Sequence, residues 1–192
     1  GVWHMYFEVL NKATGLGEIG YATSHNLTDW TYQKIILREP FHLSYPMIFE
    51  FENELYMVPE TRNAQEIRLY KSAGNYDEWH QVGVLANGDY ADATLFQHDG
   101  KWWMYALNGT NSLHLFFSSK LYGPWQLHPA SPIVESNKRI SRPGGSVIKQ
   151  KGGLYRVTQD GIPLYGSRVR MMKVNEIDNN DYSEEESENS PI

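Results

Sequence analysis

A short phrase recurs along this chain: an aromatic residue or isoleucine is followed seven positions later by a second aromatic residue. Successive copies start 47 and 52 residues apart, and they run from Phe49 to Tyr56, from Phe96 to Trp103 and from Ile148 to Tyr155. A lone tryptophan closes three of the units at similar spacing, at Trp30, Trp79 and Trp125. A period in this range, built from strand-like segments, is typical of the blades of a β-propeller.

The second and third units are the clearest. In the second, strands are predicted over residues 47–51, 55–58, 67–70 and 79–85, with a tight turn at 52–54. The third repeats this order, and its Asp99-Gly100 pair is a strong hairpin signal because glycine adopts the positive φ of such turns. Each unit is therefore expected to be a four-stranded antiparallel meander.

The two end units are less regular. The fourth has strands over 146–150, 154–159 and 168–174 around a Lys151-Gly152-Gly153 turn, and any fourth strand falls among acidic residues. The first starts one strand late, so its innermost strand is missing. We expect an all-β propeller domain over residues 1–177, with blades at about 1–38, 39–88, 89–137 and 138–177 and an acidic tail over 178–192. The chain is then part of a five-bladed propeller or a compact four-bladed variant.

Charge and composition exclude several classes of partner. The chain has 192 residues and a net charge of −6, but six of its 23 acidic residues lie beyond residue 177. The body is thus neutral without a basic stripe, which argues against nucleic acid, and the acidic end is most simply solvated. No segment has the roughly 18–20 consecutive apolar residues of a membrane span, so no membrane insertion is expected. The chain has no cysteine, and its compartment is undetermined.

Acidic residues mark the predicted channel ends of the blades. Aligning the units places Glu8, Glu60 and Gln159 at the ends of second strands, with Asp160 next to the last, and Asp92 four residues before an aromatic phrase. A buried acid costs free energy unless it is paired. Each acid alone could cap a turn or pair with an arginine, whereas the set, converging from several blades, favours a ligand site.

Two loops before inner strands add polar groups. The loop from Glu39 to Pro46 contains His42 and Tyr45, and proline makes such a loop stiff; alternatively it is a plain linker in which a carbonyl satisfies His42. Arg142 could clamp a carboxylate or phosphate, or simply pair with Glu60 or Asp92. The repeated tryptophans resemble a sugar-stacking set, but a place shared by every blade favours packing. No metal site and no cofactor are expected.

Several motifs together resemble a known family. They are His42-Leu43-Ser44-Tyr45-Pro46, Tyr56-Met57-Val58-Pro59-Glu60, Leu121-Tyr122-Gly123-Pro124-Trp125, Arg142-Pro143-Gly144, and Gln159-Asp160 through Tyr165-Gly166. This set is similar to the N-terminal propeller domain of plant glucosamine inositolphosphorylceramide transferases. That domain is related to the five-bladed propellers of arabinanase and β-xylosidase glycoside hydrolases.

The resemblance implies possible chemistry. The related hydrolases use a general base, a pKa-tuning aspartate and a general acid from different blades, and Asp92 and Glu60 resemble two of these. The base usually lies in an Asp-Pro pair on the first inner strand, which this chain lacks; the matching place in the second unit holds Tyr45-Pro46.

Two hypotheses follow. In the first, the domain processes a sugar or glycolipid-type glycan: Glu60 is the acid, Asp92 is the base or pKa modulator, and the remaining residues bind substrate, namely Glu8, His42, Tyr45, Arg142, Gln159, Asp160 and Tyr165. In the second, the domain is a non-catalytic carbohydrate-binding or accessory module. Its expected partners are a carbohydrate ligand and a fused or associated transferase domain.

Overall fold

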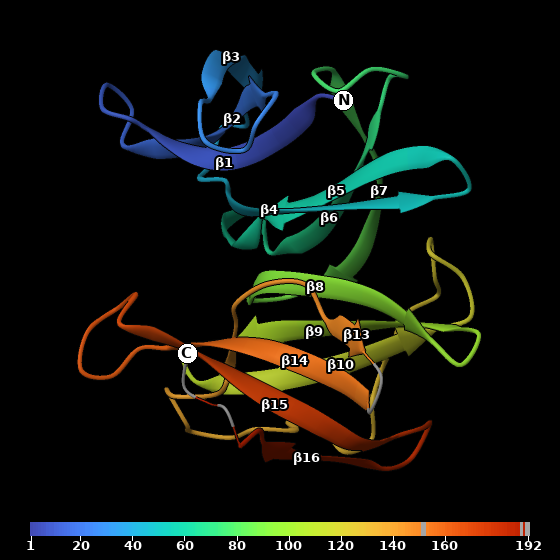
Figure 1. Ribbon diagram of the computed structural model, residues 1–192. Helices are drawn as coiled ribbons and strands as arrows, with labels where there is room; N and C mark the ends of the chain where they lie inside the picture. Colours follow the sequence, from blue (N-terminus) through green and yellow to red (C-terminus); the bar gives the residue numbers. More distant parts are fainter. Residues whose placement is uncertain (151–152, 189, 191–192) are drawn as a thin grey trace. The chain divides into compact units, whose positions relative to one another are not determined.

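Antiparallel β-sheets make up nearly all of the regular structure. A computed structural model describes residues 1–150, 153–188 and 190. The chain divides into two compact units, Gly1–Gly88 and Asp89–Ile192, and each contains two sheets (Figure 1). Within the described residues, the single helical element is the 3₁₀ turn Arg62–Ala64. The predicted all-β class is therefore confirmed.

The first sheet of unit 1 has three strands. They are β1 (Trp3–Asn11), β2 (Leu16–Ser24) and β3 (Thr31–Leu37), in the order β1-β2-β3. β1 pairs with β2 over its whole length, from Trp3 opposite Ser24 to Asn11 opposite Leu16. The expectation that the first repeat, at about residues 1–38, has one strand fewer than the others is confirmed, because its sheet has three strands among the described residues.

The second sheet is a complete meander. It contains β4 (Ser44–Phe51), β5 (Glu54–Glu60), β6 (Glu66–Ser72) and β7 (Trp79–Asn87) in sequence order. Glu52 and Asn53 form the predicted turn with φ of 53° and 60°, as a tight two-residue hairpin requires. The apolar core of unit 1 gathers around Ile19, Leu37, Leu43, Met57 and Tyr70, with Trp79 packed against it.

The first sheet of unit 2 repeats this plan. Its strands are β8 (Tyr90–His98), β9 (Lys101–Asn108), β10 (Ser112–Ser118) and the short β11 (Gln126–Leu127). Asp99 and Gly100 form the predicted turn, again with positive φ. Trp103 and Tyr105 of β9 are almost fully buried in the core of this unit, so the aromatic phrase reports packing.

The last sheet has a divided inner strand. β12 (Arg142–Pro143) and β13 (Ile148–Gln150) both pair with β14 (Gly153–Asp160), followed by β15 (Arg168–Ile177) and β16 (Tyr182–Glu186). A Cβ on Gly144 would lie 2.7 Å from the backbone carbon of Thr158, so glycine permits the close approach to β14 at the break. Of the predicted turn, Lys151 and Gly152 lie outside the described residues.

The acidic end of the chain contributes a strand. The sequence predicts a solvated end over residues 178–192, whereas β16 pairs with β15. Glu184 of β16 accepts hydrogen bonds from Nε and Nη2 of Arg156, and both side chains are buried. The expectation of a solvated end therefore fails at Glu184, which one buried arginine on β14 holds in the sheet, whereas Glu185 and Glu186 of the same strand are exposed. The boundary at residue 177 and the blade limits stay predictions.

Candidate functional site

Two residues at equivalent places in the repeat have left-handed backbones. Tyr45 and Asp92, each near the start of the first strand of a sheet, have φ of 44° and 50°. Both lie where the strand register shifts, between Ser44 and Met47 and between Ala91 and Thr94. Positive φ is costly for side chains larger than glycine, and a bulge redirects the side chain. Both features make these positions candidates for a functional role.

Asp92 pairs with Arg142 inside unit 2. The Asp92 side chain is 1% exposed, and Arg142 on β12 donates from Nε to its Oδ2. Oδ1 of Asp92 is buried and has no hydrogen-bond partner among the described residues. Asp92 and Arg142 were both predicted as site residues, and Asp92 was one of the two partners expected for Arg142. Their pairing engages one oxygen of the buried carboxylate and leaves the other without a partner among the described residues.

A hollow of about 240 Å³ lies beside this pair. Tyr165 is 74% exposed, and its ring lies 5.1 Å from Cζ of Arg142, a cation–π distance. Gln159 donates from Nε2 to the carbonyl of Pro143 at 2.8 Å. The hollow is lined by Thr110, Asn111, Lys138, Ser141, Arg142, Gln159, Gly161 and Tyr165.

Two further unsatisfied polar atoms belong to this lining. Oδ1 of Asn111 and Oγ of Ser141 are buried and lack a hydrogen-bond partner in the described part of the chain. Native proteins leave few such atoms, and each costs about 1–3 kcal/mol when it stays unpaired. The hollow therefore presents two polar atoms that are open to a hydrogen bond from water or from a ligand.

Asn111 and Ser141 were not predicted from the sequence. Asn111 lies in the turn between β9 and β10, and Ser141 lies in the loop before β12. Neither occupies a strand-end position of the repeat, and neither is titratable. The one usable signal is that Ser141 directly precedes the predicted Arg142.

Asp160 faces away from Gln159, its neighbour on β14. It is fully buried, and its carboxylate pairs with Arg170 at 2.8 Å, Arg139 at 3.3 Å and Arg168 at 3.8 Å. The backbone N–H of Ile162 donates to its other oxygen at 2.9 Å. Burial alone would raise the pKa of Asp160, but that backbone bond and Arg170 outweigh it and hold the pKa below its usual value. Both oxygens of the Asp160 carboxylate are therefore engaged, one by three arginines and the other by a backbone N–H. A role of Asp160 in binding a ligand stays a prediction.

Glu8 and His42 come together in unit 1. Oε1 of Glu8 lies 3.4 Å from Nε2 of His42, while Nδ1 of His42 accepts the backbone N–H of Gly17 at 2.9 Å. Neutral His42 therefore carries its proton on Nε2, facing Glu8. A Cβ on Gly17 would lie 2.2 Å from the carbonyl oxygen of Leu43, so only glycine fits there. Glu8 lies within β1, which continues to Asn11, and not at the strand end expected.

Glu60 is the last residue of β5 and pairs in register with Ser44 of β4. It is half-buried and belongs to unit 1, as does Tyr45. The predicted partnership of Glu60 with Asp92 as acid and base stays a prediction.

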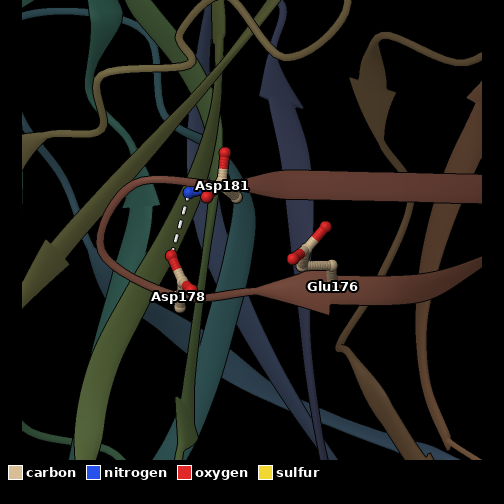
Figure 2. A group of neighbouring side chains, drawn as sticks. All are labelled: Glu176, Asp178 and Asp181. Carbon is tan, nitrogen blue, oxygen red and sulfur yellow. Dashed lines mark hydrogen bonds between the residues drawn. The ribbon is translucent and has the colours of Figure 1, made fainter.

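Three exposed acids form a separate group in the hairpin between β15 and β16 (Figure 2). The ligand oxygens of Glu176, Asp178 and Asp181 all lie within 4.8 Å of one another. Oδ1 of Asp178 accepts the backbone N–H groups of Asn180 and Asp181 at 2.8 and 2.9 Å. The turn itself therefore explains where Asp178 lies, although the three oxygens could also approach a divalent cation.

Comparison with known families decides the relationship. The family model described as Glucosamine inositolphosphorylceramide transferase 1, N-terminal, matches residues 1–190. The chain belongs to this family. The resemblance predicted from the motifs is thus confirmed.

Two relatives that contain this N-terminal domain are plant proteins. The chain is 35% identical over 189 residues to glucosamine inositolphosphorylceramide transferase 1 of Oryza sativa subsp. japonica, covering 94% of the chain and 25% of that protein. It is 31% identical over 192 residues to the Arabidopsis thaliana protein of the same name, covering 95% and 25%. The chain therefore spans about a quarter of the length of these relatives. Among the described residues, no helix is long and apolar enough to cross a membrane.

Solved structures show the fold of this family member. A thermostable family-43 glycoside hydrolase matches with a TM-score of 0.74 at 15% identity, covering 100% of this chain and 73% of the enzyme. A GH43_1 enzyme from Xanthomonas citri in complex with xylose has a TM-score of 0.72 at 13% identity, covering 95% and 68%. An exo-β-1,3-galactanase from Phanerochaete chrysosporium with galactose has a TM-score of 0.70 at 20% identity, covering 91% and 43%. The chain has the β-propeller fold of these glycoside hydrolases.

Proposed function

We propose that this domain is a non-catalytic carbohydrate-binding module that accompanies a glycosyltransferase. The observation that carries the proposal is the hollow in unit 2, where Oδ1 of Asn111 and Oγ of Ser141 are buried without partners. A ligand that offers several hydroxyl groups on a small frame would satisfy both atoms. A sugar ring is such a ligand.

The lining suits a sugar chemically. The Asn111 oxygen accepts from a sugar hydroxyl, whereas the Ser141 hydroxyl can donate or accept. The guanidinium of Arg142 stiffens the edge of the hollow, and the exposed ring of Tyr165 beside it offers an apolar face. At about 240 Å³ the hollow is smaller than the roughly 300–1,000 Å³ of most ligand pockets. We therefore expect it to hold one sugar unit, such as the end of a glycan.

The pairing of Asp92 favours binding over catalysis. A general base must reach and accept a proton from its target, but Oδ2 of Asp92 is already engaged by Arg142. The pair instead fixes Arg142 at the edge of the hollow. A role beside a transferase agrees with the names of the relatives, of which this chain spans 25%.

Calorimetric titration with glucosamine, galactose and xylose tests the proposal. We expect saturable binding of at least one sugar, and Ser141→Ala should weaken it about tenfold, or about 1.4 kcal/mol. Ser119→Ala, a change at an exposed serine of the same unit, serves as the control and should bind as the parent does. Absence of binding to all three sugars and to their oligosaccharides would refute the module.

One observation keeps hydrolysis as the second candidate. Oδ1 of Asp92 is unpaired on a left-handed residue, and Glu60 remains the predicted acid. A screen on nitrophenyl glycosides separates the two functions. Turnover that disappears in both Asp92→Asn and Glu60→Gln would replace the module with a glycoside hydrolase, whereas a binding module shows no turnover above buffer.

A further inference from the structure

The loop over residues 161–167, between β14 and β15, carries two strongly exposed apolar side chains. Leu164 and Tyr165 are 73% and 74% exposed, and among the described residues the next large hydrophobic side chain, Leu10, is 58% exposed. Scattered apolar residues are normal on a protein surface, but adjacent ones surrounded by polar groups mark interaction sites. The tip of this loop is therefore a candidate interaction site.

A tight turn presents both side chains. The carbonyl of Leu164 accepts the backbone N–H of Ser167 at 3.2 Å, and Gly166 has a φ of 75°. These features match a type II β-turn, in which glycine at the third position supplies the positive φ. The Ser167 hydroxyl also donates to that carbonyl at 2.5 Å and accepts the N–H of Leu164 at 3.2 Å. The exposure of Leu164 and Tyr165 therefore belongs to a closed, defined turn.

Basic residues surround the root of this loop. In the two segments that form it, residues 138–143 and 160–170, the sequence has one acid and five basic residues, namely Lys138, Arg139, Arg142, Arg168 and Arg170. Arg139 and Arg168 approach the carboxylate of Asp160 at 3.3 and 3.8 Å. The carbonyl of Lys138 accepts the N–H of Gly161, and the Tyr165 ring lies 5.1 Å from Cζ of Arg142. Contacts within unit 2 thus hold the basic residues beside the apolar tip.

Positive charge reaches solvent around the tip. The side chains of Arg139 and Arg168 are 47% and 39% exposed, whereas Asp160 between them is 0% exposed. Three acids pair with members of the basic set, namely Asp92, Asp160 and Glu186. Five basic residues against three acids leave a net charge of +2, although the whole chain has a net charge of −6. This part of the surface is therefore opposite in sign to the chain as a whole.

We propose that the basic loop face, formed by Leu164, Tyr165 and the five basic residues, docks on the surface of an anionic lipid bilayer. No segment crosses the bilayer; the two apolar side chains lie among the headgroups. A bilayer fits better than a nucleic acid or an acidic protein, because it offers an apolar phase directly beneath a layer of negative charge. Arginine suits this boundary, since its stem is apolar and its head is charged. The proposal does not depend on a sugar in the hollow of unit 2.

Co-sedimentation of the 192-residue chain with vesicles tests the docking. The vesicles contain phosphatidylcholine alone or with about 30% phosphatidylserine. We expect binding to the anionic vesicles to exceed binding to the neutral ones at least about fivefold. The excess should disappear when the salt concentration rises from about 0.1 to about 1 M, because the Debye length then falls to about 3 Å.

Matched variants separate the apolar and the charged contributions. Leu164→Ser should weaken binding to the anionic vesicles about tenfold, whereas Leu127→Ser, at an exposed leucine of β11, should bind within about twofold of the parent. Arg168→Gln should weaken binding about threefold, and Lys120→Gln, at an exposed lysine outside this face, should not. Urea unfolding checks that each variant is folded. Tyr165 stays unchanged because it also lines the hollow.

Three results would overturn the proposal. The first is equal binding, or none, with neutral and anionic vesicles. The second is parent-like binding of Leu164→Ser, which would mean that the face attracts negative charge without apolar docking. The third is binding to a single-stranded oligonucleotide as strong as binding to anionic vesicles, which would indicate a polyanion as the partner. Leu164→Ser should still bind a sugar as the parent does, so failure of docking and failure of the carbohydrate-binding module are distinguishable.

Discussion

Asp92 and Asp160 are both buried acids that face arginine in unit 2, yet their surroundings differ. Asp160 has three arginines and a backbone N–H around it. Asp92 has Arg142 on one oxygen, and its other oxygen has no partner in the described structure.

The difference separates a structural acid from a candidate functional one. A buried carboxylate with every oxygen engaged stabilises its surroundings and offers little to a ligand. An unsatisfied one remains costly until a ligand completes its bonds. Arg156 and Glu184 resemble Asp160, because their buried groups bond each other. Asn111 and Ser141 resemble Asp92, because each has one buried polar atom without a partner among the described residues.

The largest loss of stability is expected when Glu184, the partner of buried Arg156, is replaced. Glu184→Ala leaves the 1% exposed guanidinium of Arg156 without its acid, so the free energy of unfolding should fall by about 4 kcal/mol. Urea unfolding measures the loss. Glu185→Ala, at an exposed neighbour on β16, should change it by less than about 0.5 kcal/mol. Equal losses in the two variants would show that the buried Arg156–Glu184 pair contributes no more to stability than an exposed ion pair.

In the same urea assay, replacing Asp160 should lower the free energy of unfolding more than replacing Asp92. Asp160→Asn leaves three arginines around a neutral amide and should lower the free energy of unfolding by about 3 kcal/mol. Asp92→Asn disturbs one arginine and removes an unsatisfied charge, so a loss of about 1 kcal/mol is expected. A loss at Asp92 as large as that at Asp160 would erase the distinction between them.

Acid should remove the Asp160 contribution. The folded-state pKa of Asp160 is lowered, so its stabilisation is present above the unfolded pKa of about 3.9 and is lost as pH falls through the folded pKa. The difference in unfolding free energy between the parent and Asp160→Asn should be constant above about pH 5 and shrink below about pH 4. A difference that stays constant down to pH 2.5 would contradict this assignment.

The smallest effect has the opposite sign. Ser141→Ala removes a buried hydroxyl that lacks a partner and should raise the free energy of unfolding by about 0.5–1 kcal/mol. Ser131→Ala is the matched control, because its hydroxyl bonds both the N–H and the carbonyl of Leu115; it should lower the value by about 1 kcal/mol. Thermal unfolding of both variants checks the pair, and a loss at Ser141 would mean that its hydroxyl is satisfied.

Much of the fold was predictable because packing repeats. The aromatic phrase placed the turns at Asn53 and Gly100 and the incomplete first sheet, since these depend on local spacing. β16 was not predicted because three of its five residues are acidic, and composition cannot show that one of them, Glu184, meets a buried arginine. The divided inner strand depends on the close approach at Gly144, which is a tertiary contact.

The site was only partly predictable. Asp92 and Arg142 stand at positions that the repeat singles out, and the structure joins them. Gln159 and Asp160 were predicted together, but consecutive residues of a strand point to opposite faces, so they have different surroundings. Asn111 and Ser141 lie in loops, where spacing carries no information about burial.

Chemical-shift mapping of the ¹⁵N-labelled chain during titration with glucosamine, galactose and xylose tests whether the hollow in unit 2 binds a sugar. We expect saturable shifts that are largest for the Asn111 side-chain amide and the backbone of Ser141 and Arg142. Saturable shifts confined to unit 1, or no shifts with any sugar, would contradict it.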